Sequence, residues 1–132
     1  MLGQVDGDGP ELARRCYLEE MMSGRGARPR RARAAGARLR VASNGSVHVY
    51  DLKNDAEMDH PFHLHGAFFQ VLARDDVPLA GDELANKDTV ILPQRSTVRI
   101  VTRFDEPGMW MYHCHILEHA ERGMMGEIHV AP

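Results

Sequence analysis

From about residue 37 onward, apolar and polar residues alternate along the chain with a period of two. Apolar residues at positions 37, 39 and 41 alternate with arginines, and the alternation resumes at Val47 after Ser43-Asn44-Gly45. A strand places successive side chains on opposite faces, so this pattern is typical of half-buried β-strands. Asn-Gly between two alternating runs favours a tight turn. We therefore expect a β-hairpin around this turn.

Further short runs with strand character follow along the chain. Turn-forming residues separate most of them, notably Pro93, Pro107-Gly108 and Gly123. The acidic stretch Arg74–Lys87 is interpreted as a loop, and one helical turn is expected around Ile116–Arg122. Several short strands without a long helix between them favour an all-β antiparallel sandwich or barrel. The expected strands are Ala67–Ala73, Thr89–Leu92, Thr97–Phe104, Met109–His113 and Gly126–Val130.

The charge of the chain is distributed unevenly. Residues 1–40 contain nine arginines and five acidic residues, a net of +4, whereas residues 41–132 carry a net of −7, for a total of −3. Residues 24–40 are rich in Gly, Ala, Pro and Arg and contain almost no large apolar side chain. Such a segment cannot bury enough surface to offset its ordering entropy. We expect residues 1–40 to be a basic, disordered segment and residues 41–132 to be the folded domain.

Composition also limits the partners and the compartment. The basic segment lacks the interleaved aromatic residues that a nucleic-acid-binding arm would use, so we expect no nucleic-acid partner. No stretch is apolar enough to span a bilayer. The first residues carry acids where a signal peptide has a cationic end and an apolar run, so these residues predict no export signal and leave the compartment open.

Six of the eight histidines lie in two short clusters, His60–His65 and His113–His119. On a strand, His113 and His115 would point to one face and Cys114 to the other. Cys114 could then bind one metal while its neighbours bind a second centre, an arrangement that suits electron transfer. His63 and His65 also share a face, so they can join His113 and His115. His60 can turn the other way and join Cys114.

The kinds of ligand indicate the metal. Two imidazoles, one thiolate and a weak axial thioether form the ligand set of blue copper electron-transfer sites. His60, His119, Cys114 and Met124 supply these four groups. A structural zinc site is the alternative. Zinc is disfavoured because it would leave four clustered histidines unexplained.

At these residues the sequence resembles the multicopper oxidases, the family of laccases, bilirubin oxidases and bacterial cuprous oxidases. HPFHLHG at residues 60–66 is similar to the family's third copper motif, and HCHILEHAERGMM at residues 113–125 is similar to its fourth. The resemblance covers about residues 45–131. It implies a cupredoxin-like Greek-key β-sandwich for residues 41–132. The basic segment 1–40 does not resemble the strands that begin such a domain, so the N-terminal edge is where the sandwich could be incomplete.

The resemblance also implies a role for each site residue. It implies a type 1 copper that takes electrons one at a time from a reducing substrate, and a trinuclear cluster that reduces dioxygen to water. The catalytic electron path would run through His113, Cys114 and His115. The implied type 1 ligands are His60, Cys114, His119 and axial Met124; His63 would bind type 2 copper, and His65, His113 and His115 the type 3 pair.

The chain departs from the family pattern in its number of histidines. The family's cluster uses eight, four of them from two HxH motifs elsewhere in a longer chain, whereas His48 and His129 here are isolated. We therefore expect a C-terminal domain fragment that is inactive without a domain or subunit supplying the missing histidines. The alternatives are a single-copper electron-transfer or copper-binding module and an inactive truncated remnant. The reductant could be a phenol, an amine, a bilirubin-like molecule or a metal ion. Met58, two residues before His60 and beside Glu57 and Asp59, would suit a soft metal ion such as cuprous ion, but a phenol or an amine is favoured over it.

Overall fold

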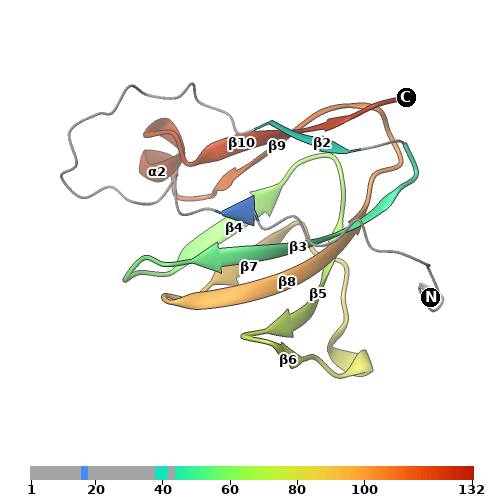
Figure 1. Ribbon diagram of the computed structural model, residues 1–132. Helices are drawn as coiled ribbons and strands as arrows, with labels where there is room; N and C mark the ends of the chain where they lie inside the picture. The colour runs from blue at the N-terminus through green and yellow to red at the C-terminus, as the bar shows by residue number, and fades with distance from the viewer. Residues whose placement is uncertain (1–15, 18–37, 42–43) are drawn as a thin grey trace.

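The computed structural model describes residues 16–17, 38–41 and 44–132, with side chains from residue 44 onward. Two five-stranded sheets lie one above the other (Figure 1). The first has the strand order β1-β3-β8-β5-β6 and the second β2-β10-β9-β4-β7. Neighbouring strands are antiparallel except β1 with β3 and β2 with β10. The strands are β1 (Cys16–Tyr17), β2 (Arg38–Val41), β3 (Val47–Asn54), β4 (His60–Leu64), β5 (Phe69–Arg74), β6 (Val77–Pro78), β7 (Thr89–Leu92), β8 (Ser96–Arg103), β9 (Gly108–Cys114) and β10 (Met125–Val130).

The core lies between the two sheets. Along β8 and β4 every second residue is buried, as the period of two predicts. The inward side chains of both sheets form one apolar cluster that includes Leu52, Phe62, Ile100 and Tyr112. The all-β, cupredoxin-like sandwich expected from the sequence is confirmed.

The predicted hairpin around Asn44-Gly45 is wrong. β2 and β3 flank this turn but belong to different sheets. The Asn44 N–H donates to the Ala131 carbonyl oxygen at 2.9 Å, and the Gly45 N–H donates to that of Phe104 at 2.6 Å. The turn therefore carries the chain from one layer to the other, because each flanking strand finds its partner far away in the sequence.

The stretch expected to be a loop, residues 74–87, contains additional structure. β6 pairs with β5 through a turn in which Asp75 and Asp76 have positive φ angles of 47° and 63°. Asp is accepted in turns with positive φ, but the usual signal is an Asn or Asp followed by Gly, and this turn has no glycine. A short 3₁₀ helix, Gly81–Glu83, follows. The five strands expected from residue 67 onward have observed limits within two residues of the expected ones, whereas β4 was not among the expected strands.

Two short strands fall within the segment expected to be disordered. β1 lies beside β3, and most of β2 lies beside β10, so each takes an edge position in its sheet. The remaining residues of 1–37 lie outside the described part of the chain, and the division at residue 40 stays a prediction. Among the described residues, no helix has the length and apolar character to cross a membrane.

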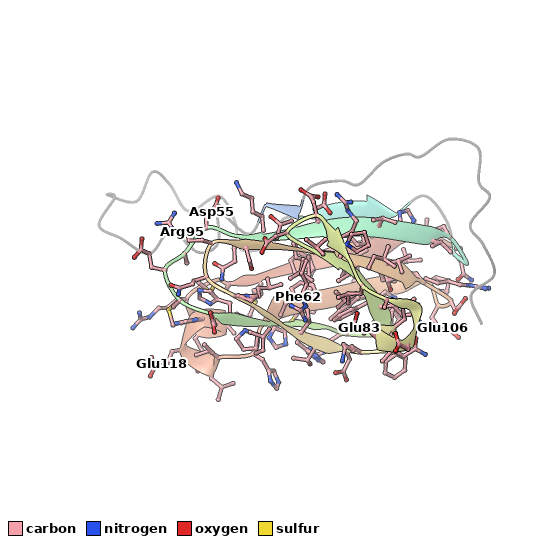
Figure 2. All side chains as sticks on the ribbon, turned by 90° about the horizontal axis from the view of Figure 1, so that it is seen from below. Asp55, Phe62, Glu83, Arg95, Glu106 and Glu118 are labelled. Carbon is pink, nitrogen blue, oxygen red and sulfur yellow. The ribbon has the colours of Figure 1, made fainter. Side chains whose placement is uncertain are left out.

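The loop that precedes the first histidine cluster and the helix that follows β9 lie at the same end of the sandwich. The helix α2 (Leu117–Glu121) connects β9 to β10 at the left in Figure 1. Figure 2 shows Glu118 of α2 at the same end of the molecule as Asp55 and Arg95, with Phe62 near the middle. Glu83 and Glu106 lie at the opposite end. The loops before β4 and before β8 thus share an end with α2.

Candidate metal centre

The two histidine clusters are brought together by strand pairing. β4 and β9 are antiparallel neighbours, and their register places His63 opposite His113 and Phe62 opposite Cys114. One residue beyond the end of β9, the His115 N–H donates to the carbonyl oxygen of Pro61 on β4 at 2.8 Å. Residues about fifty positions apart in the sequence therefore form one site on the second sheet.

Alternation along these strands separates the site into two groups. His60 on β4 is 3% exposed and Cys114 on β9 is 7% exposed, so both face the interior of the sandwich. His63 and His113 are only partly buried and lie on the outer face of the sheet. This arrangement agrees with the strand geometry expected from the sequence.

The inner group is a compact triangle of three ligand atoms. His60 Nδ1 and His119 Nδ1 are 3.2 Å apart. Cys114 Sγ lies 3.6 Å from the first and 3.7 Å from the second. For a first-row metal ion with bonds of about 2.0 Å to nitrogen and about 2.3 Å to sulfur, three donors in one plane lie roughly 3.5–3.7 Å apart. The two sulfur–nitrogen distances have this size, and the nitrogen–nitrogen distance of 3.2 Å is slightly shorter, so the triangle is close to the size that one such ion needs.

The short helix after β9 places His119 at this triangle. The His119 N–H donates to the Ile116 carbonyl oxygen at 3.0 Å, which starts the short helix α2 directly after β9. The turn brings the His119 side chain back over Cys114, five residues earlier. On the other side, His60 Nε2 is buried without a hydrogen-bond partner among the described residues, so only Nδ1 of this ring engages the group.

Met124 lies beside the inner group. Its carbonyl oxygen accepts the Cys114 N–H at 3.0 Å, and its own N–H donates to the His119 carbonyl oxygen at 3.0 Å. The β9–β10 register pairs Met125 with His113, so Met124 stands opposite Cys114 and its side chain takes the same, inward face. The side chain is buried. This placement fits a weak axial ligand.

The outer group consists of imidazoles alone. One ring nitrogen from each of His63, His65 and His113 lies within 4.8 Å of the others. His65 Nε2 and His113 Nε2 are 2.9 Å apart. The His115 ring is centred 5.2 Å from that of His63 and 5.9 Å from that of His113, so it borders the group. His65 and His115 are exposed, and the group opens to the outside.

Hydrogen bonds fix which nitrogen each ring presents. His63 Nδ1 donates to the Asp88 carbonyl oxygen at 2.9 Å and lies equally close to Thr89 Oγ1. His113 Nδ1 donates to the Cys114 carbonyl oxygen at 2.8 Å. Both rings therefore turn Nε2 toward the histidine group, where His113 Nε2 lies 2.9 Å from His65 Nε2. Metal-bound histidines usually donate their other ring N–H in this way. Asp88 and Thr89 could not be predicted as partners of His63, because β7 meets β4 only in the folded sheet.

Burial shifts the pKa of one cysteine and two histidines of the site. Burial raises the pKa of the Cys114 thiol, and a hydrogen bond with the Ile116 backbone acts in the opposite direction. Burial also lowers the pKa of His60, helped by His119 and opposed by Asp59. The pKa of His65 is lowered by burial and then by the neighbouring histidines. A lowered pKa favours the neutral imidazole of His60 and His65, which is the form that a metal binds.

Other residues considered from the sequence lie outside the two groups. Asp59 accepts the Gln94 N–H at 2.9 Å, so its carboxylate caps the turn after β7. Glu118 and Glu121 are exposed on α2. Glu57 pairs with Arg95 at 2.5 Å, and Met58 is exposed beside it. His48 on β3 and His129 on β10 are remote from both groups in the strand order or register.

A two-sheet sandwich with a buried His-Cys-His triangle and an outer histidine group defines a cupredoxin-like metalloprotein. The family model for multicopper oxidases matches residues 17–132. The chain belongs to the multicopper oxidase family, and this membership implies copper and oxidoreductase chemistry.

Individual relatives agree with the family assignment. A multicopper oxidase of Staphylococcus epidermidis is 45% identical over 86 residues, which cover 62% of this chain and 19% of that protein. Laccase-1 of Melanocarpus albomyces is 36% identical over 95 residues, covering 55% of this chain and 15% of that protein. The solved multicopper oxidase of Campylobacter jejuni, described as a metallo-oxidase, superposes with a TM-score of 0.64 at 35% identity, covering 70% of this chain and 20% of that one. The chain thus spans about a fifth or less of the length of these relatives.

Proposed function

We propose that the inner group, His60, Cys114 and His119 with Met124 as the axial residue, holds a type 1 copper. The ligand set is that of blue copper sites, and the 3.2–3.7 Å triangle is close to the size required. Copper bound there supplies one-electron redox chemistry, receiving electrons from a small-molecule or metal-ion reductant. His119 is the less buried of the two imidazoles, so its ring is the side from which a reductant can approach.

We further propose that His63, His65, His113 and His115 provide half of a trinuclear copper site that reduces dioxygen to water. The observation that carries this proposal is the adjacency of the two groups on β9. Cys114 faces inward and His113 outward, and His113 Nδ1 also bonds to the Cys114 carbonyl oxygen. Cys114 and its flanking histidines therefore join the two centres through a few covalent bonds, a short path for electrons.

The outer group requires a second contributor of histidines. Four imidazoles open to the outside are half of the family's set, and the flanking face of β9 exposes Met109 and Met111. An exposed apolar border around an incomplete metal site fits coverage by another domain or subunit. We propose that such a domain supplies the remaining histidines and that the isolated chain is inactive as an oxidase.

A second candidate function rests on the completeness of the inner group. All four proposed type 1 ligands come from this chain, so it could act as a single-copper electron carrier without any partner. The adjacency of the outer histidines to Cys114 favours the oxidase function, because a simple carrier has no use for them.

Oxygen consumption with a phenolic or ferrous donor separates these functions. The copper-loaded chain is expected to show no water-forming turnover alone, and to gain it with a related domain that carries two HxH motifs. His113→Ala should remove the gained activity while Cys16→Ser, the matched control, should keep it. Robust turnover by the isolated chain, lost in His113→Ala, would contradict the need for a partner. Failure to gain activity with the domain would favour the electron carrier.

A further inference from the structure

Asn54, the last residue of β3, is fully buried, with 0% of its surface exposed. Its side-chain amide donates to the Met58 carbonyl oxygen at 2.9 Å, and to those of Leu92 at 2.9 Å and Pro93 at 3.1 Å. Its Oδ1 accepts the Ala56 N–H at 2.9 Å. One side chain thus contacts four backbone groups in two separate segments, with the two N–H groups of the amide shared among three carbonyls.

These two segments are the ones that border His60. The loop 55–59 leads directly into His60, and Leu92 is the residue paired with His60 across β4 and β7. Asn54 therefore fixes the chain before His60 and the strand end beside it. Asp55 and Arg95, which belong to the two segments, lie together at one end of the sandwich in Figure 2.

Two further hydrogen bonds connect the same segments at the surface. The Arg95 N–H donates to the Ala56 carbonyl oxygen at 3.2 Å. Asp59 accepts from the Gln94 N–H at 2.9 Å, with the carboxylate exposed. Polar interactions between exposed groups compete with water and contribute little to stability. The buried amide is held in a low-dielectric surrounding, where its hydrogen bonds are stronger and their loss costs more.

We propose that Asn54 is a positioning residue for the inner copper site, acting through His60. The inference rests on the proposed type 1 assignment. A metal ligand has to be held within about 0.5 Å of its productive position, and the two other ligands of the triangle come from the opposite side, β9 and α2. His60 is the ligand whose backbone depends on the loop that Asn54 ties down. Without this amide, the Met58 and Leu92 carbonyls would lose their hydrogen bonds from Asn54, while the Pro93 carbonyl would keep the Ser96 hydroxyl at 2.6 Å. The loop before His60 would then shift toward water and move the first residue of β4.

The test compares copper release from Asn54→Ala and Thr102→Ala. Thr102 is also buried, and its Oγ1 donates to the Phe68 carbonyl oxygen at 2.9 Å. It lies six residues along β8 from Ser96, the partner of Asn54, which is roughly 20 Å from the site end. The full chain is loaded with Cu(II), and loss of the visible thiolate band is followed after adding a chelator. We expect release about 10–100-fold faster than wild type from Asn54→Ala, with a shifted band, and release unchanged from Thr102→Ala.

The controls make each outcome decisive. Circular dichroism of the copper-free proteins reports folding, and Asn54→Ser replaces Asn54→Ala if the latter fails to fold. Wild-type release from a folded Asn54 variant, or equal acceleration in Thr102→Ala, would overturn the positioning role. Failure of both Asn54 variants to fold while Thr102→Ala folds would also overturn it, because the role would then be global stability. A wild-type chain without any thiolate band would overturn the type 1 proposal itself, a result visible before the variants are compared.

Discussion

Cys114→Ser is expected to abolish the intense visible absorption of the copper-loaded chain. The band arises from charge transfer between a thiolate and copper, and a serine hydroxyl cannot supply it. Cys114 Sγ is the one sulfur ligand at the corner of the inner triangle, 3.6 and 3.7 Å from the two imidazole nitrogens. The expected effect is complete loss of the band, measured by absorption spectroscopy after addition of one equivalent of Cu(II).

Cys16→Ser is the matched control, because Cys16 is the other cysteine of the chain. This variant should keep the full band. Persistence of the band in Cys114→Ser, or its loss in Cys16→Ser, would show that the thiolate ligand has been misassigned.

Gly66→Ala is expected to lower the free energy of unfolding by about 2–5 kcal/mol. Gly66 follows His65 and has φ +76°, and a Cβ added there would lie 2.1 Å from Cε3 of the Trp110 ring. A left-handed backbone costs a non-glycine residue about 1–2 kcal/mol, and forcing an atom into packed surroundings typically costs about 1–3 kcal/mol more. Denaturant unfolding of the copper-free protein measures the difference.

Gly45→Ala isolates the backbone part of this effect. Gly45 has a similar φ of +78° but no atom within 4 Å of an added Cβ, so only about 1–2 kcal/mol should be lost. Trp110 is the single tryptophan, so its fluorescence should change in Gly66→Ala and not in Gly45→Ala. Equal losses of stability in the two variants would contradict the close contact with Trp110.

Local patterns in the sequence predicted the strands well, because alternation depends on residues two apart. Thr89–Leu92 was predicted with its observed limits. Which strands pair is a question of tertiary structure, and there the prediction of a hairpin at Asn44-Gly45 was wrong. A turn residue specifies a change of direction, but it does not specify whether the next strand joins the same sheet.

In the site, too, local sequence patterns predicted some features, while others depend on tertiary contacts. The division of Cys114 from His113 follows from strand geometry alone, and the structure places them on opposite faces as expected. The supporting groups could not be predicted. Asp88 and Thr89 approach His63 from 25 and 26 residues away, and Asn54 reaches Leu92 across 38 residues. Neither an asparagine at a strand end nor an aspartate in a loop carries a motif that would reveal such contacts.

The central claim is that this chain holds one complete inner copper site and a separate outer histidine group. A copper titration of wild type, His119→Ala and His113→Ala, followed by absorption and electron paramagnetic resonance, tests it most directly. We predict that the first equivalent gives wild type and His113→Ala the same blue, thiolate-bound copper signal, and that His119→Ala loses it. A colourless wild-type complex, or a blue signal lost in His113→Ala and kept in His119→Ala, would contradict the claim.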